Sequence, residues 1–385
     1  MKPIALRLLL VIGGMAFGLG VIELSLHLFP GLLPPAVRQA LAIYDDSHET
    51  QDLYQPFVAN DELMYVPRPG VDIEIHSGLT LSYTVRTRSL GDPSIGFRDS
   101  PPTLPAYAVA AGDSQTWGTY VEADETWPNQ LEAEAGAPVI NMGVLGYGPL
   151  QYQIVTEKYA LPKHPRVVLW GFFAGNDITD SKDYAGWVKG GKQGTGLTQP
   201  ESGVRDFLSR NIRLYELLKL AFHAGIYSPR GATERALTVP APGGPDWTFY
   251  PDVLESLADG RRPDVAEGWS LTQKALLETR VAAQADGPQF VVVIIPPKEL
   301  IYWDTLLRGR LADPAAYDLA EPVRTLTDFC EAQRLDCLDL TPAFLEHAAN
   351  GEELYFREDA HLNPAGHRLA AQLIKAYLAQ QGLLP

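Results

Sequence analysis

Four polar residues in this sequence have side chains that could together perform nucleophilic acyl transfer: Ser114, Asn176, Asp359 and His361. A serine hydroxyl can act as the nucleophile, a histidine can remove its proton, and a carboxylate can orient that histidine. A neutral side-chain amide can donate a hydrogen bond to the oxyanion that forms in the transition state. These groups make a reaction centre only if the fold brings them to one place.

Five short runs that are apolar at nearly every position predict the elements that carry these residues. The runs are AYAVAAGDS, APVINMGVLGYG, RVVLWGFFAGND, QFVVVIIPPKE and LDCLDLTP, and helical patterns lie between several of them. Runs that are apolar throughout indicate strands covered on both faces, hence a parallel sheet wrapped by helices. We therefore expect an α/β fold whose active crevice lies beyond the carboxyl ends of the strands.

The turns that follow these runs place the candidate side chains at one edge of the expected sheet. The first run ends in Gly-Asp-Ser at residues 112–114, the second in NMGVLG at residues 141–146, and the third in Gly-Asn-Asp at residues 175–177. After the last run comes REDAHLNPAGH, which contains Asp359 and His361. A nucleophile, an amide, a carboxylate and a base are thereby expected in one crevice.

The order Gly-Asp-Ser, Asn-x-Gly-x-x-Gly, Gly-Asn-Asp and a late Asp/His pair resembles the SGNH, or GDSL, hydrolase superfamily. The resemblance covers about residues 105–180 and 285–380, and ETWPNQLEAE at residues 125–134 fits the helix that commonly follows the nucleophile block. It implies a three-layer α/β/α sandwich with a central, mainly parallel sheet. It also implies serine chemistry that uses neither a metal nor a cofactor, and no HExxH motif or other metal-ligand cluster occurs in the sequence.

The resemblance gives each candidate residue a role. Ser114 would be the nucleophile, His361 its general base, and Asp359 the carboxylate that holds the imidazole tautomer. The backbone N–H groups of Ser114 and Gly146 and the side-chain amide of Asn176 would form the oxyanion hole.

The orienting carboxylate departs from the commonest pattern of the superfamily. Many members place it three residues before the histidine, and this chain has Glu358 at that position. A branch that resembles the periplasmic alginate-acetylation proteins in this detail uses Asp-x-His, which Asp359 and His361 match. We therefore prefer Asp359 and keep Glu358 as the alternative.

Each candidate also has an ordinary structural explanation. Ser114 and Asn176 could be only helix N-caps, and Gly143 and Gly146 could be turn glycines without a ligand. His361 could be a loop histidine with satisfied hydrogen bonds. A non-catalytic site requires all these explanations to hold at once, so we prefer the catalytic interpretation.

A C-terminal helix is predicted after the Asp/His pair. Asn363 would cap this helix and Pro364 would occupy its first turn. We expect His367 to be an exposed residue of the same helix.

The first thirty residues predict a segment that enters or crosses a membrane. Lys2 and Arg7 precede the apolar run LLLVIGGMAFGLGVI at residues 8–22. Basic residues before an apolar run keep the N-terminus in the cytoplasm, and the rest of the chain is then delivered across the membrane. We expect residues 1–30 to be an uncleaved single-pass anchor in a bacterial inner membrane. A cleaved signal peptide and a buried soluble helix are the alternatives.

The remaining chain divides into a strap and a main domain. Residues 31–104 are rich in Pro, Asp and Tyr and include alternating pieces such as LTLSYTVRTRS, which predict a strap with short strands. Residues 105–385 would form the SGNH domain, with an insertion at about residues 181–262 that contains the amphipathic pattern VRDFLSRNIRLYELLKLAFHAG. The insertion either covers the crevice or packs without a role in substrate binding.

The segment GWVKGGKQ at residues 186–193 nearly matches the phosphate-binding pattern GxxxxGK[ST]. Gln193 replaces the metal-binding hydroxyl residue, and no predicted strand leads into the segment. We interpret it as a flexible loop.

The two cysteines of the chain, Cys330 and Cys337, lie close together in DFCEAQRLDCLDL. Their spacing allows a disulfide in an oxidising periplasm, and two separate buried thiols are the equal alternative.

The sequence as a whole favours an envelope enzyme. The chain has 385 residues and a formal net charge of −16, which argues against nucleic-acid binding because no basic stripe faces phosphates. We expect a membrane-anchored, periplasm-facing serine esterase or lipase that hydrolyses an acyl ester through an acyl-enzyme. An O-acyltransferase acting on a cell-envelope glycan is the first alternative. A non-catalytic subunit of an envelope complex is the second, and in it Glu23 and His27 would face a partner helix.

Overall fold

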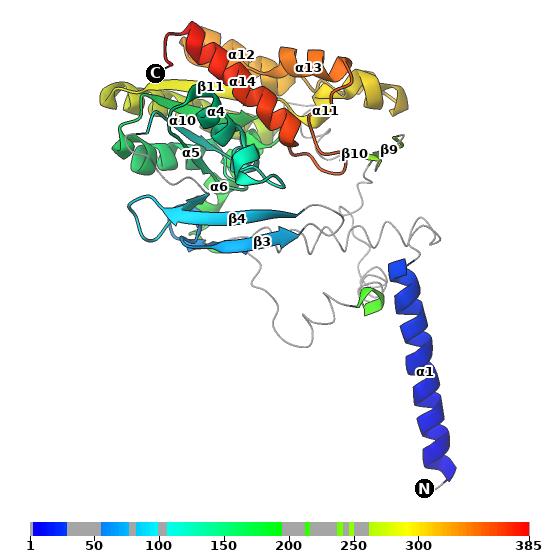
Figure 1. Cartoon of the computed structure of the whole chain (residues 1–385). Helices are drawn as coiled ribbons and strands as arrows, with labels where there is room; N and C mark the ends of the chain where they lie inside the picture. The colour runs from blue at the N-terminus through cyan, green and yellow to red at the C-terminus, as the bar shows by residue number, and fades with distance from the viewer. Residues whose placement is uncertain are drawn as a thin grey trace. The chain divides into compact units, whose positions relative to one another are not determined.

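The computed structural model describes most of the chain (Figure 1). The described residues are 3–28, 55–76, 82–98, 106–194, 212–215, 237–241, 246–249 and 262–384. The chain divides into two compact units. One comprises residues 1–55, 76–81 and 198–233, and the other comprises residues 56–75, 82–197 and 234–385. The domain boundaries expected from the sequence stay predictions.

The first unit contains helix α1, Pro3–Leu28, where the sequence predicts an anchor. The carboxylate of Glu23 accepts hydrogen bonds from the backbone N–H groups of Arg213 at 2.7 Å and Leu214 at 2.8 Å, and Nε2 of His27 lies 2.9 Å from the same carboxylate. Among the described residues, no helix combines the length and the apolar character that a bilayer crossing requires. The predicted transmembrane helix is therefore not supported.

The second unit is built around a five-stranded sheet in which every pair of neighbouring strands is parallel. Its strand order is β12 (Asp336–Asp339), β11 (Gln289–Ile295), β8 (Val167–Phe173), β6 (Ala108–Gly112) and β7 (Val139–Gly143). Every residue of β6, β7 and β8 is buried, because helices cover both faces. The five apolar runs of the sequence correspond to these five strands, so the predicted α/β sheet is confirmed.

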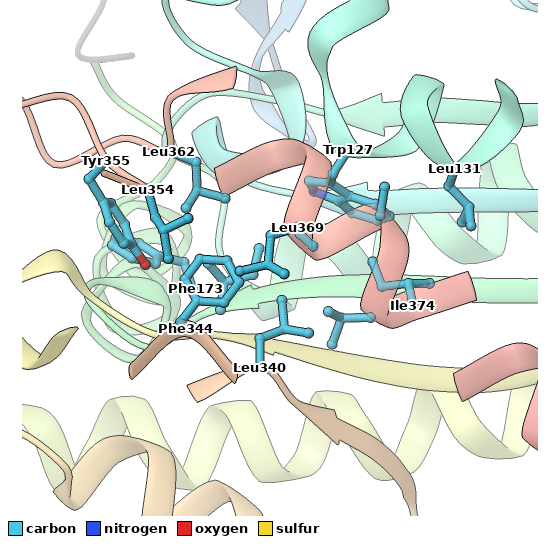
Figure 2. Close-up of a cluster of buried hydrophobic side chains, with 14 of the residues drawn as sticks. Trp127, Leu131, Phe173, Leu340, Phe344, Leu354, Tyr355, Leu362, Leu369 and Ile374 are labelled. Carbon is cyan, nitrogen blue, oxygen red and sulfur yellow. The ribbon is translucent and has the colours of Figure 1, made fainter. Parts of the chain in front are cut away.

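Helices cover the two faces of this sheet (Figure 1). Trp127 and Leu131 of α4, Phe344 of α13, and Leu369 and Ile374 of α14 belong to a hydrophobic cluster on one face, shown in Figure 2. These helices span Trp127–Ala135, Thr341–Ala349 and Pro364–Gln380.

On the other face, Trp170 of β8 packs edge-on against Tyr152 of α5 and against Phe290 of β11. Helix α5 (Pro149–Val155) packs with α6 (Asp177–Lys189) and α10 (Pro263–Asp286), and Trp269 of α10 contacts Phe329 of α12 (Glu321–Gln333). The three-layer α/β/α arrangement is therefore confirmed.

Short antiparallel pieces precede the main sheet, as predicted for the strap. They are the pair β1 (Phe57–Asn60) and β2 (Met64–Pro67), and the three-stranded sheet of β3 (Asp72–His76), β4 (Ser82–Ser89) and β5 (Gly96–Arg98). Arg98 is buried and donates to the carbonyl oxygens of Trp117 at 2.6 Å and Gly118 at 2.5 Å. This part of the chain therefore packs directly against helix α3 (Ser114–Trp117), which begins with the candidate nucleophile.

The region expected to be an insertion is only partly described. Helix α6 extends to Lys189, so the first half of the segment at residues 186–193 is helical and its interpretation as a flexible loop is wrong there. Ile178, Tyr184 and Trp187 of α6 are buried, which the glycine-rich composition of the segment concealed. Most of the predicted amphipathic helix at residues 204–225 lies outside the described residues.

The C-terminal helix α14 begins as predicted. Asn363 Oδ1 accepts hydrogen bonds from the backbone N–H groups of Ala365 at 2.9 Å and Gly366 at 3.0 Å, and Pro364 is the first helical residue. The prediction that His367 is exposed is wrong, because its ring is fully buried and its Nδ1 accepts a hydrogen bond from the backbone N–H of Trp127 at 3.2 Å. Burial lowers the pKa of His367 to about 3, so the ring is neutral.

Cys330 at the end of α12 and Cys337 in β12 form a disulfide, with their Cα atoms 6.2 Å apart. The structure thus selects the first of the two arrangements that the spacing allowed. The bond closes a short loop between the helix and the edge strand of the sheet.

Removing this disulfide should lower the stability of the domain. A loop this short gives an expected loss of about 2 kcal/mol, because the cross-link restricts the unfolded chain. The unfolding temperature of the wild type should fall when reductant is added. The unfolding temperature of the variant with Cys330→Ser and Cys337→Ser should not change with reductant. A wild type whose mass shows two free thiols after non-reducing purification would contradict the bond.

Candidate active site

The carboxylate of Asp359 lies against the imidazole of His361. Asp359 Oδ1 accepts a hydrogen bond from the backbone N–H of His361 at 2.7 Å and also contacts Nδ1 of the same ring. Burial acts to raise the pKa of Asp359, but the charge and hydrogen bonds of His361, with the charge of Lys298, outweigh it and hold the pKa below its usual range. Asp359 is therefore ionised, as a group that orients an imidazole must be.

Glu358, the alternative carboxylate, makes no such contact among the described residues. Burial raises its pKa, and the charge of Lys298 opposes this effect. The structure thus places the carboxylate of the Asp-x-His pattern, and not the one three residues before the histidine, on Nδ1 of His361.

Ser114 is the first residue of α3, immediately after strand β6. The N-cap of this helix is Asp113, whose Oδ1 accepts from the backbone N–H of Gln115 at 2.9 Å, so the explanation of Ser114 as a simple N-cap is wrong. The hydroxyl of Ser114 lies 3.4 Å from Asp113 Oδ2, a long hydrogen bond that leaves the hydroxyl weakly held. Ser114 is partly exposed, whereas the three residues that follow it in α3 are buried.

Gln115 joins the nucleophile turn to the Asp/His segment. Its Nε2 donates to the carbonyl oxygen of Ala360 at 3.2 Å, and its Oε1 accepts from the backbone N–H of Leu362 at 3.0 Å. Gln115, the residue after Ser114, therefore binds the backbone on both sides of His361. Gln115 did not emerge from the sequence as a site residue, because only its position after Ser114 sets it apart from any other buried polar residue.

Tyr120 adds a second contact on the same side. Its ring packs edge-on against the imidazole of His361, with 5.7 Å between ring centroids, and against Phe356 at 6.1 Å. Tyr120 has a φ of 66°, a left-handed conformation that non-glycine residues seldom adopt. Local strain at a residue packed on the candidate base is typical of functional sites.

The loop after β7 presents Gly146 at the surface. Gly146 is exposed and has a φ of 66°, and its backbone N–H donates to no other group among the described residues. The N–H of Gly143 is already donated to Asn141 Oδ1 at 2.9 Å, and a Cβ atom at Gly143 would lie 2.4 Å from the backbone N of Trp117. Gly143 therefore has a packing role, and Gly146 has the free donor that an oxyanion hole needs.

Asn176 precedes helix α6 but makes no capping hydrogen bond with its side chain. Its Oδ1 is buried without a partner in the described structure. The turn is fixed by Asp177, whose carboxylate accepts from the backbone N–H of Phe173 at 3.0 Å and from the hydroxyl of Tyr152 at 2.8 Å. The capping explanation for Asn176 is therefore wrong for its side chain.

A small cavity begins at Asn176. Residues 174–176, which follow β8, line it together with side chains of α6, α10 and α12, including Ile178, Trp269 and Pro322. Ser114 and His361 do not line this cavity, so the candidate reaction centre opens beside it and not within it. In the described part of the chain, no group of three His, Cys, Asp or Glu side chains could hold a metal ion.

Asp113 carries a buried charge directly beneath the nucleophile. Burial raises its pKa to about 6, while the N–H of Gln115, the charge of His361 and the hydroxyl of Ser114 act in the opposite direction. Because the folded state binds this proton more tightly than the unfolded state, the stability that Asp113 contributes is present at acidic pH and is lost as the pH rises through 6.

Asp113→Asn should therefore stabilise the protein at pH 7, by up to about 3 kcal/mol, because asparagine keeps the capping oxygen without the buried charge. The gain should vanish near pH 4, where the wild-type carboxyl is protonated. Thermal unfolding at pH 7 and at pH 4 measures the difference in stability between the variant and the wild type. Asp328→Asn, on the exposed face of α12, is the control. Equal effects of the two variants at pH 7 would show that no buried charge is present at position 113.

Residues 241–384 match the model of the family described as "SGNH hydrolase-like domain, acetyltransferase AlgX". No curated protein matches the chain. Solved structures that resemble it include the acetyl xylan esterase AlAXEase, with 11% identity over 70% of this chain and 99% of that one and a TM-score of 0.38. A catalytic mutant of the acetylxylan esterase Axe2 from Geobacillus stearothermophilus has 10% identity, coverage of 74% and 97%, and a TM-score of 0.37. A GDSL-like lipase from Bacteroides thetaiotaomicron has 10% identity, coverage of 74% and 92%, and a TM-score of 0.35.

The family match contains Asp359 and His361, while Ser114, Gly146 and Asn176 lie before it. The resemblance to the SGNH superfamily that the sequence motifs carried is thus confirmed for the part of the chain that the family model matches, residues 241–384.

Proposed function

We propose that this protein is a serine esterase of the SGNH type that cleaves an acyl ester through a covalent acyl-enzyme. The observation that carries the proposal is the Asp359–His361 pair, held beside the turn of Ser114 by the side chain of Gln115. A base with an oriented imidazole, next to a weakly held serine hydroxyl, is the arrangement that activates a nucleophile.

In the proposed first step, Ser114 Oγ attacks the ester carbonyl carbon while Nε2 of His361 takes the hydroxyl proton. The carbonyl oxygen becomes an oxyanion, which would accept hydrogen bonds from the N–H groups of Ser114 and Gly146 and from the amide of Asn176. The tetrahedral intermediate then collapses, the C–O bond to the alcohol breaks, and His361 returns the proton to the leaving alkoxide. Asp359 stays ionised and stabilises the imidazolium throughout.

The second step decides the class of the enzyme. Water activated by His361 would release the free acid, whereas a sugar hydroxyl would carry the acyl group away as a new ester. The same residues serve both reactions, because the acyl-enzyme does not specify what attacks it. The description of the matching family as an acetyltransferase favours acyl transfer as the second candidate function, and we propose a glycan hydroxyl as the acceptor.

We also propose that the domain works outside the cytoplasm, in the periplasm. Two features support this location: the disulfide between Cys330 and Cys337, which persists in oxidising compartments, and the basic residues Lys2 and Arg7 before the N-terminal apolar run. Both the ester and the glycan acceptor would then belong to the cell envelope.

Ser114→Ala should abolish release of acid from a short acyl ester by the full-length protein, because the proposed acyl-enzyme forms on the Ser114 hydroxyl. Thermal stability should change by less than about 1 kcal/mol, because the side chain is partly exposed and weakly bonded. Ser270→Ala, on the exposed surface of α10, is the matched control. A retained rate in Ser114→Ala would exclude Ser114 as the nucleophile.

The same assay with glycan oligomers separates the two candidate functions. Acid release that glycan does not change supports the esterase, and the appearance of the acyl group on the glycan supports the transferase. Ester that stays intact under both conditions, with no labelling of Ser114 by a fluorophosphonate, would favour a non-catalytic subunit.

Asp359→Asn should lower kcat by about a thousandfold or more, because an amide at this position favours the wrong tautomer of His361. Glu358→Gln should change kcat by less than about threefold, since its carboxylate does not contact the ring. Steady-state kinetics of the two variants give the ranking. The reverse order would identify Glu358 as the orienting carboxylate.

A further inference from the structure

Lys298 is a fully buried cation that takes no part in the proposed chemical steps. It is the first residue of α11 (Lys298–Ile301), which follows strand β11. Its Nζ lies within hydrogen-bond distance of four backbone carbonyl oxygens, those of Thr248 at 2.8 Å, Phe356 at 3.0 Å, Arg357 at 2.9 Å and Asp359 at 2.9 Å. Three of these four carbonyls belong to the segment that ends in the Asp/His pair.

The remaining surroundings of the ammonium are aromatic. Nζ lies 4.9 Å from the ring centroid of Phe249 and 5.5 Å from that of Trp247, both in strand β10 (Trp247–Phe249). The backbone N–H of Thr248, between them, donates to the carbonyl oxygen of Arg357 at 2.8 Å. Strand β10 and Lys298 therefore hold the same stretch of backbone from two directions.

We propose that Lys298 is a positioning residue whose ammonium group fixes residues 356–359 so that the carboxylate of Asp359 meets Nδ1 of His361. This inference rests on the proposed function. It assigns no proton transfer to Lys298, because its Nζ is enclosed by carbonyl oxygens and rings.

The geometry fits a protonated amine and not a neutral one. An ammonium has three N–H donors and no acceptor, and backbone carbonyl oxygens only accept. A neutral amine would keep two donors and would turn its lone pair towards a carbonyl oxygen. A methionine at the same position would have similar length but would remove the donor to the carbonyl oxygens of Thr248, Phe356 and Asp359, which is costly.

Several ionisable groups surround the ammonium. Burial lowers the pKa of Lys298 to about 8, while the carboxylates of Glu299, Asp359 and Glu358 act in the opposite direction. Arg357 lies over the ring of Trp247 at 5.8 Å, and its guanidinium pairs with Glu353. Lys298 is therefore charged at neutral pH and loses its proton above pH 8, where the hold on residues 356–359 should weaken.

Hydrogen exchange followed by mass spectrometry tests the positioning role without any assay of activity. The amides of Phe356 and His361 are good probes, because they donate to His361 O at 3.0 Å and to Asp359 Oδ1 at 2.7 Å. In the full-length protein, Lys298→Met should raise the exchange rate of the amides of residues 356–361 at least tenfold above that of the wild type. The exchange rate of the amides in α4 should not change. Lys189→Met, at an exposed lysine of α6 that pairs with Glu267, should match the wild type.

The pH profile of ester hydrolysis distinguishes a positioning role of Lys298 from a role that only fills space, because only the positioning role depends on the charge of Lys298. The wild-type kcat should fall above about pH 8, and Lys298→Met should show at least tenfold lower kcat at pH 7, KM within twofold, and no further fall at alkaline pH. An alkaline fall that persists in Lys298→Met would overturn the proposal, as would unchanged exchange at residues 356–361.

A variant that does not fold and a wild type that hydrolyses no ester are separate outcomes. If Lys298→Met does not fold, the wild type is compared at pH 7 and pH 9.5 after correction for intrinsic exchange, and equal protection of residues 356–361 overturns the proposal. If the wild type hydrolyses no ester, the proposed function fails, and the exchange experiment still decides whether Lys298 holds this segment.

Discussion

The two hydrogen bonds of the Gln115 side chain are the contacts on which the candidate site depends. They join the turn of Ser114 to Ala360 and Leu362, residues 245 and 247 positions further along the chain. Strand β6 places Ser114 at the carboxyl edge of the sheet, but nothing in that strand determines where a C-terminal loop should lie. Gln115 uses both its donor and its acceptor on the backbone that flanks His361, so the base and the nucleophile share one support.

The site also gathers buried charge that a simple core would avoid. Asp113 and Asp177 are both fully buried, and burial is the main cause that raises the pKa of each carboxyl. The charge of Asp113 raises the pKa of Asp177 further, because like charges repel in a poorly solvated region. Each carboxylate accepts backbone N–H bonds at a turn that carries a candidate group, Ser114 in one case and Asn176 in the other. Burying these carboxylates costs free energy, but each carboxylate fixes a turn that carries a candidate group. Acyl transfer needs rigid hydrogen-bond donors at these turns.

The sequence predicted the parts of the fold whose signals are local. Each apolar run became a strand of the parallel sheet. Four of these strands are almost fully buried, because a strand covered on both faces needs apolar residues throughout, and only the edge strand β12 is partly exposed. Asn363 capped the helix that its spacing indicated. The choice of Asp359 also agrees with the geometry, since a carboxylate two residues before the ring reaches Nδ1.

What the sequence could not predict depends on partners far along the chain. His367 looked like a surface residue because its hydrogen bond goes to the backbone of Trp127, 240 positions earlier. Gln115 gave no signal, since its hydrogen-bond partners are backbone groups that any residue type supplies.

The residues before the main sheet are part of the support of the site, and Arg98 shows how. Its guanidinium donates to the carbonyl oxygens of Trp117, Gly118 and Val121, at the end of the short helix that Ser114 begins. Helix α3 has a single turn and cannot satisfy its own terminal carbonyls, so a buried cation does so. Lys298 acts in the same way on the segment before His361. Each half of the candidate site therefore rests on a cation that binds backbone oxygen. One cation lies before the first strand of the main sheet and the other follows strand β11, so the site can form only when both segments have folded onto the sheet.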